Sequence, residues 1–322
     1  MCYSAQIRAD HRIYVRLFGA DISIGPFVEL FYNRQQPGNK LKIPRGMELA
    51  FADPQTPEEV EIKNLIDAFN GEQATKLGQD LFEQRKRLVD AERKLQQTQT
   101  KTALESQRIA TSKIARAKDN LADLRRTEVK ARDSRIFPLV YAPVMVVQDG
   151  KKVVLPMRYQ CRQQGRPASY DVEFSGTYNA RRDNLERFWK RQFGYTHGVL
   201  LINAFYENVN RHKMEGRERE LSPDEKVENV VLEFRPKPTQ DMLVACLWSR
   251  WTADGQPDLL SFAAITDAPP AEVAAAGHDR CIIPIRPENV DVWLNPDPKK
   301  LIEQYAILDD RERPYYEHLL AA

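Results

Sequence analysis

The segment 72–133 contains no proline and only one glycine, Gly78, and it constrains the fold more than any other stretch of the sequence. Its apolar side chains recur at the spacing of a helix that buries one face: Leu77, Leu81, Leu88, Ala91, Leu95, then Ile114, Ala117, Leu121, Leu124. One straight helix of this length would extend about 90 Å, so its two ends could not both return to one compact body. We therefore predict an antiparallel helical hairpin, a coiled coil, that turns within residues 96–102.

This helical segment begins at a recognisable signal. Thr56 and Pro57 suit the N-cap and first position of a helix, and Asn70-Gly71 predicts a break in it. Residues 72–135 carry 16 Lys and Arg against 10 Asp and Glu, whereas the whole chain has a net charge of only +2. A basic helical face of this kind suits a solvated surface, a nucleic-acid backbone or a partner helix.

The residues on either side of this segment favour β structure. The runs 13–18 and 27–32 are β-branched and aromatic, but their period also allows short helices, and 47–51 reads as a strand. Further strands are expected at 139–147 and 152–157, joined by an Asp149-Gly150 hairpin turn, and at 198–206, 230–234, 243–248 and 259–265. Helices are expected at 183–192, 287–294 and 298–308.

We therefore predict an α+β fold. Residues 1–55 and 136–322 would form a β-rich, barrel-like body, and residues 56–135 would form the inserted antiparallel helical hairpin.

Composition limits the environment of the chain. Its four cysteines form no C-x-x-C pair and no zinc spacing, so we expect neither a metal site nor a cofactor. With no signal peptide and no long apolar run, we expect a cytoplasmic protein without a membrane span.

The second residue, Cys2, has unusual chemical potential. Methionine aminopeptidases remove an initiator Met that precedes a small residue, and Cys2 would then carry a free α-amine beside its thiol. An α-amine has a pKa of about 7.7–8.0, so part of it is neutral and can form a Schiff base with an aldehyde. The thiol can then close a thiazolidine ring. Taken alone, Cys2 is better interpreted as an ordinary residue of a frayed terminus.

Three internal patches combine polar residues with apolar flanks: Tyr178-Asn179-Ala180-Arg181, Ala204-Phe205-Tyr206-Glu207 and Gly277-His278-Asp279-Arg280. Each also has a plain structural reading. Asn179 suits a helix N-cap, Glu207 a carboxylate beyond a strand end, and His278 a loop histidine. Arg181 and Arg280 suit the surface.

In this order and with the N-terminal Cys, the motifs N-A-R, F-Y-E and H-x-R resemble those of the SOS response-associated peptidase (SRAP) family. The closing Val292-Trp293-Leu294 fits as well. The resemblance covers about residues 1–55 and 136–300 and leaves the helical insert outside.

The resemblance implies a sensor of abasic sites in single-stranded DNA that crosslinks to them through a thiazolidine on Cys2 and so shields the lesion. Asn179 would orient the terminus, Glu207 would act as general acid and base in ring opening and in reversal of the crosslink, and His278 would move protons. Arg181 and Arg280 would bind phosphates. The family name also implies self-processing, the removal of Met1.

The chain departs from the family pattern in three places. One is Asn208, where family members often have a Trp after F-Y-E. Family members often continue the Cys with G-R-F, whereas this chain reads Tyr3-Ser4-Ala5, so an early phosphate-binding Arg is lost or replaced by Arg8. The family's W-G region corresponds to Arg158-Tyr159-Gln160. Tyr159 would then stack an unpaired base beside a DNA-binding Arg158, or serve as a core aromatic.

Two other functions fit the same residues. Cys2 and His278 suit a thiol peptidase, as nucleophile and base. The helical hairpin alternatively makes the protein a scaffold that recruits a protein partner.

Overall fold

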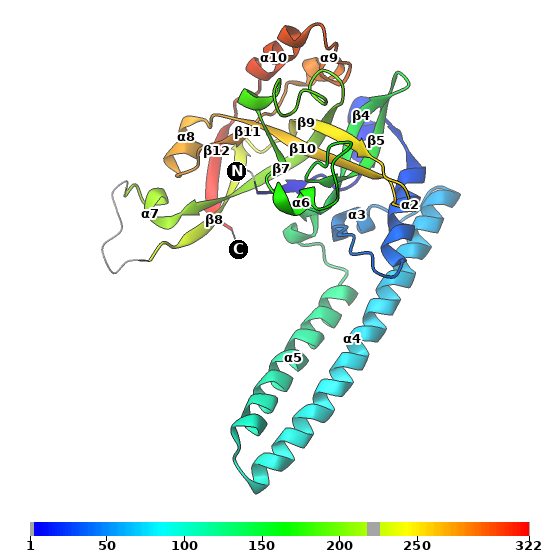
Figure 1. Ribbon diagram of the computed structural model, residues 1–322, viewed down its shortest axis with the longest axis vertical. Helices are drawn as coiled ribbons and strands as arrows, with labels where there is room; N and C mark the ends of the chain where they lie inside the picture. The colour runs from blue at the N-terminus through cyan, green and yellow to red at the C-terminus, as the bar shows by residue number, and fades with distance from the viewer. Residues whose placement is uncertain (1–2, 218–225, 322) are drawn as a thin grey trace. The chain divides into compact units, whose positions relative to one another are not determined.

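The computed structural model describes residues 3–217 and 226–321 (Figure 1). The chain divides into two compact units. We call the first, Met1–Asp53 with Lys130–Ala322, the sheet unit, and the second, Pro54–Val129, the helical unit. The sheet unit is therefore assembled from both ends of the chain.

The helical unit contains α4 (Pro57–Gln97) and α5 (Lys101–Arg125), which lie side by side and run in opposite directions (Figure 1). As predicted, Thr56 caps α4, because its side chain accepts a 3.2 Å hydrogen bond from the Glu59 N–H. The two helices meet where Arg87 Nε donates to Ser106 Oγ at 2.9 Å. The coiled-coil character of this pair remains a prediction.

The predicted helix break at Asn70-Gly71 is wrong, because α4 continues through both residues. One glycine inside a helix costs only about 1 kcal/mol relative to alanine. Good helix formers on both sides offset that cost in a helix of 41 residues.

The sheet unit contains one mixed sheet, in which the described residues form twelve strands. These are β1 (Ser4–Ile7), β2 (Asp21–Ile22), β3 (Arg135–Ile136), β4 (Tyr141–Gln148), β5 (Lys151–Tyr159), β6 (Asn179–Arg181), β7 (His197–Asn210), β8 (Asn229–Lys237), β9 (Met242–Trp251), β10 (Leu259–Asp267), β11 (Cys281–Ile282) and β12 (Tyr315–Leu320). Pairing runs from β4 to β5, β10, β9 and β7 and back to β4. The observed class is a mixed α/β fold with one large sheet, and the barrel-like shape remains a prediction.

The strand and turn predictions of this unit are largely confirmed. Strands lie at every range expected after residue 139, and β7 is longer than its predicted segment. Asp149 and Gly150 join β4 to β5 with φ of 50° and 74°, the positive values of a tight hairpin turn.

Short helices cover the sheet. Those with α geometry are α1 (Arg12–Phe18), α2 (Ile24–Gln35), α3 (Arg45–Leu49), α6 (Tyr170–Glu173), α7 (Arg211–Met214), α8 (Ala271–Ala275), α9 (Val290–Leu294) and α10 (Leu301–Asp309). The described residues also form three 3₁₀ turns: η1 (Ala131–Ser134), η2 (Arg182–Asn184) and η3 (Pro287–Asn289). None of the helices among residues 3–217 and 226–321 is long and apolar enough to cross a membrane.

The N-terminal runs are helices, which was the alternative reading of 13–18 and 27–32. Phe27, Leu30, Phe31 and Arg34 are the buried residues of α2, and their spacing is that of one helix face. Helix α1 is held by Tyr14, whose hydroxyl donates to Pro143 O at 3.0 Å and accepts from Leu201 N–H at 2.8 Å.

Two other element predictions are wrong. Residues 47–51 were expected to be a strand but lie mostly in α3. Residues 183–192 were expected to be a helix but form η2 followed by turns. In the second segment Leu185 and Trp189, four residues apart, are both buried. A helix that buries one face has the same spacing, so the sequence pattern does not distinguish it from this series of turns.

Candidate functional site

The buried contact between Glu207 and His278 is the centre of the candidate site. Glu207 belongs to β7, and His278 follows Gly277, whose φ of 92° turns the chain after α8. His278 Nε2 lies 3.1 Å from Glu207 Oε2, and the side chains are 6% and 0% exposed. The two motifs F-Y-E and H-x-R are therefore brought together, 71 positions apart in the chain but in direct contact.

The hydrogen bonds of His278 define how this pair handles a proton. Its Nδ1 lies 2.8 Å from Arg280 O, and a carbonyl oxygen only accepts, so Nδ1 carries a hydrogen. The Arg280 N–H is 3.4 Å from the same nitrogen and contributes less. Burial lowers the pKa of His278, which favours the neutral ring. A ring nitrogen and a carboxyl group 3.1 Å apart can exchange a proton, which suits the pair for acid and base catalysis.

Asn179 brings an amide to the site from β6. The residue pairs with Ala264 of β10 and is 7% exposed. Neither its amide oxygen nor its amide nitrogen has a hydrogen-bond partner among the described residues. Buried amides are nearly always hydrogen-bonded, so the lack of a partner for Asn179 among the described residues is unusual.

The start of the described chain lies between these elements. Ser4 of β1 pairs with Tyr206, the neighbour of Glu207 in β7. The ring of Tyr3 contacts the ring of Tyr178, the neighbour of Asn179, with centroids 6.3 Å apart. Cys2 itself lies outside the described residues, but it is bonded to Tyr3. Tyr3 thus contacts the motif that contains Asn179, and Ser4 pairs with the motif that contains Glu207.

Arg181 and Arg280 lie on opposite sides of the end of β10, because Thr266 pairs with Arg181 on one side and with Ile282 on the other. Arg181 binds Asp183 through Nε at 3.0 Å and Nη2 at 2.5 Å, and Arg280 Nη2 lies 3.6 Å from Asp279. The hydrogen bonds from Arg181 lower the pKa of Asp183, and Arg280 adds to this effect. Such surface pairs contribute only about 0–1 kcal/mol, so a phosphate can replace their carboxylates.

The described cysteines do not offer a second nucleophile. Cys161, Cys246 and Cys281 are buried. Burial raises the pKa of the Cys161 thiol to about 12 and raises those of the other two as well. Within residues 3–217 and 226–321, no group of three His, Cys, Asp or Glu is placed to hold a metal ion.

Comparison with protein families decides where the chain belongs. The model of the SOS response associated peptidase family (SRAP) matches residues 94–318, which is more than half of the chain. This chain is a member of the SRAP family. The matched region contains Asn179, Glu207 and His278. It begins at residue 94, so it includes part of the helical segment expected to lie outside the resemblance and does not include residues 1–55.

Three solved structures are similar to this SRAP protein at low identity. A protein from Bordetella bronchiseptica is 15% identical, covering 61% of this chain and 90% of its own, with a TM-score of 0.45. A Bacteroides thetaiotaomicron protein is 14% identical, covering 59% and 78%, with a TM-score of 0.46. A phage-related protein from B. bronchiseptica is 16% identical, covering 62% and 85%, with a TM-score of 0.43. No curated protein matches the chain.

Tyr159, one of the two expected DNA-binding residues of β5, lies inside the SRAP protein. It is 2% exposed, its ring stacks on Phe262 with centroids 5.1 Å apart, and it meets Tyr178 edge-on at 5.7 Å. This is the core-aromatic alternative. In this conformation the Tyr159 ring packs against Tyr178 and has little exposed surface on which a nucleic-acid base could stack.

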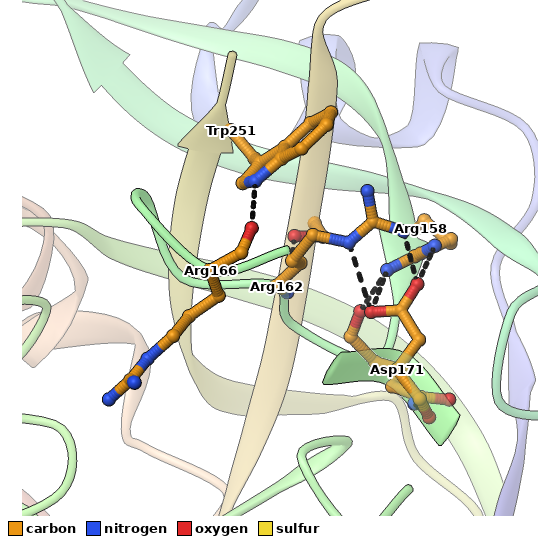
Figure 2. Close-up of polar contacts among 7 residues, drawn as sticks. Arg158, Arg162, Arg166, Asp171 and Trp251 are labelled. Carbon is orange, nitrogen blue, oxygen red and sulfur yellow. Dashed lines mark hydrogen bonds and ion pairs between the residues drawn. The ribbon is translucent and has the colours of Figure 1, made fainter. Parts of the chain in front are cut away.

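Arg158 and Arg8, the other arginines considered for DNA, are both occupied. Arg158 donates to both carboxylate oxygens of Asp171, at 2.8 and 3.1 Å, and is 9% exposed (Figure 2). Arg8 Nε is 2.7 Å from Asp241. A phosphate would have to displace a carboxylate from either of them.

Asp171 binds a second arginine and so forms a buried ionic cluster. Arg162 Nε donates to Oδ1 at 3.1 Å, its Nη2 also donates to the carboxylate, and its guanidinium lies 4.5 Å from the ring centroid of Trp251 (Figure 2). Burial alone would raise the pKa of Asp171, but the hydrogen bonds from Arg162 and Arg158 outweigh it and hold the pKa below its usual range. The cluster therefore has a structural role.

We predict that Asp171→Asn lowers the free energy of unfolding by about 3–5 kcal/mol, because it leaves two nearly buried guanidiniums without a carboxylate. The matched control is Asp258→Asn, which removes the carboxylate bound to the exposed Arg250 and should cost about 0.2–1 kcal/mol. Urea unfolding measures both. Because the folded-state pKa of Asp171 is lowered, its contribution is present at neutral pH and is lost as the pH falls below about 4. Equal losses in the two variants would contradict a structural role for the cluster.

Proposed function

We propose that this SRAP protein captures abasic sites in single-stranded DNA by a covalent crosslink to Cys2. The ring-opened abasic sugar exposes an aldehyde, and the α-amine of Cys2 attacks its carbon to give a carbinolamine. Loss of water gives an imine. The thiol then adds to the imine carbon, its proton moves to the nitrogen, and a thiazolidine ring closes. No oxidant or cofactor is required.

The Glu207–His278 pair supplies the proton transfers that these reaction steps need. Ring opening of the sugar needs a base at its hydroxyl and an acid at the ring oxygen, and loss of water from the carbinolamine needs an acid. The Glu207 carboxyl group lies 3.1 Å from the His278 ring, so a proton can pass between the two groups during these steps. The same groups, used in the opposite direction, would reverse the crosslink.

The buried amide of Asn179 is the observation that carries the proposal. Its oxygen and nitrogen have no partner within the described part of the chain, and its neighbour Tyr178 contacts Tyr3, the residue bonded to Cys2. An α-amine is a donor that an amide oxygen can orient. A processed N-terminus would thus satisfy a buried polar group that is otherwise costly.

Arg181 and Arg280 would bind phosphates on either side of the lesion. The side chain of Arg181 is 50% exposed and that of Arg280 is 19% exposed, and each is paired with an exposed carboxylate. Self-processing, the loss of Met1, must come first, because a peptide nitrogen cannot form the imine. The peptidase activity of this chain would then be the removal of its own Met1.

The test uses purified protein and a single-stranded oligonucleotide with one abasic site at neutral pH. We expect an adduct that survives denaturing electrophoresis. A matched oligonucleotide carrying a tetrahydrofuran residue, which has the same gap but no aldehyde, should give none. No adduct with the abasic oligonucleotide, or equal adducts with both, would rule out the proposal.

A further inference from the structure

Arg135 is a cation whose guanidinium is held between two aromatic rings. It belongs to β3 and pairs with Gln6 of β1. Its guanidinium carbon lies 3.7 Å from the centroid of the Tyr206 ring and 4.9 Å from that of Phe137. Stacking on aromatic faces restricts the plane of the guanidinium, so its remaining N–H groups have a fixed direction.

The hydrogen bonding of Arg135 leaves its charge unneutralised. Nε donates to Ser4 Oγ at 3.2 Å. Among the described residues no carboxylate lies within ion-pair distance of it, and the acidic neighbour Glu233 binds Arg235 instead. Partial burial lowers the pKa of the Arg135 guanidinium, although Tyr206 and Glu233 oppose this. Arg135 therefore has no carboxylate partner among the described residues, and an anion would balance its charge.

The position of Arg135 relative to the candidate site suits a flanking contact. Ser4, its hydrogen-bond partner, pairs with Tyr206, and Phe137 contacts Tyr3 with ring centroids 5.6 Å apart. Glu207 follows Tyr206, and successive residues of a strand point to opposite faces. Arg135 therefore lies close to the end of the chain that bears Cys2 but on the other face from the carboxylate that would transfer protons.

We propose that Arg135 binds a backbone phosphate of the DNA strand next to the captured abasic site. The inference rests on the proposed function and adds to it a phosphate contact from β3. A guanidinium fork with two free N–H edges matches the oxygens of a phosphodiester, and the aromatic rings lower the entropy lost when it binds. No other described group competes for this edge of Arg135.

The experiment measures binding to intact single-stranded DNA, so it does not depend on crosslinking. Fluorescence anisotropy of a labelled oligonucleotide without abasic sites is followed from low to high salt for wild type and Arg135→Gln. We expect Arg135→Gln to bind about 10- to 100-fold more weakly at low salt. Its slope of log affinity against log salt should be shallower by about 0.7, the value for one phosphate on a single strand.

Two further variants separate this role from a structural one. Arg135→Lys keeps the charge but loses the planar fork, so its salt slope should match that of wild type while its affinity falls. Arg250→Gln removes an exposed arginine that is bound to Asp258, and it should match wild type in both respects. The thermal unfolding midpoint of each variant shows whether the fold is intact.

Each failure has its own signature. If wild type binds intact DNA but Arg135→Gln and Arg135→Lys keep its affinity and slope, the phosphate contact is overturned, whatever happens in the crosslinking assay. If Arg135→Gln weakens binding as expected but wild type forms no adduct with abasic DNA, the proposed function fails and the phosphate contact stands. If wild type does not bind intact single-stranded DNA at low salt, the phosphate contact is overturned.

Discussion

Replacing Cys2 with alanine is expected to abolish the denaturation-stable adduct with abasic single-stranded DNA. Alanine keeps the α-amine once Met1 is removed, so it can still form an imine, but an imine hydrolyses during denaturation. Only a thiol on the adjacent carbon can close the thiazolidine. The measurement is the fraction of oligonucleotide shifted on a denaturing gel, and mass spectrometry of the purified variant verifies that Met1 has been removed.

Cys2→Ser separates the role of the thiol from that of the amine. The serine variant should give no stable adduct by itself, yet borohydride added during the reaction should trap the imine as a stable amine. An equally stable adduct from Cys2→Ser without borohydride would end the thiazolidine hypothesis. The matched control is Cys161→Ser, which removes a thiol whose pKa is raised to about 12 by burial and should leave adduct formation unchanged.

The helices of the first 55 residues illustrate how far the sequence predicts the fold. The buried residues of α2 recur at the spacing of one helix face, which is a helical signal. The segment as a whole, however, is rich in β-branched and aromatic residues, which favour strands. Packing decided the outcome, as it does when propensity and pattern disagree. Short strands such as β6 and β11 have only three and two residues and give no pattern of their own. Their pairing with β10 exists because the rest of the sheet is already in place.

The candidate site was predictable as a set of residue types and not as a geometry. Motif order identified Glu207 and His278, and only the fold reveals that they touch. Arg158 and Tyr159 are expected from the sequence to contact DNA, but in the structure the Tyr159 ring packs in the core and Arg158 binds Asp171. Arg135 carries no sequence signal, because its environment depends on the ring of the distant Tyr206 and on a carboxylate, Glu233, that binds another arginine.

Glu207→Gln is expected to slow adduct formation by about 10²- to 10⁴-fold, the usual contribution of a positioned acid or base. Glutamine has the same shape, and its amide can still donate a hydrogen bond to His278 Nε2, so the local packing should survive. It cannot take up or release the proton that ring opening and loss of water require. The measurement is the rate of adduct formation with protein in excess, followed on denaturing gels from seconds to hours.

Binding and chemistry are separated by two comparisons. The affinity of Glu207→Gln for intact single-stranded DNA should equal that of wild type, because Glu207 is 0% exposed and contacts His278 instead of the solvent. Glu317→Gln, which removes an exposed carboxylate bound to Lys237, should form the adduct at the rate of wild type. The reverse reaction, release of DNA from a preformed adduct, should slow in Glu207→Gln by a factor similar to that of the forward reaction, because an acid–base catalyst lowers the same barrier in both directions. A forward rate within about threefold of wild type, far below the usual effect of losing such a group, would remove Glu207 from the mechanism and leave the buried pair as a structural contact.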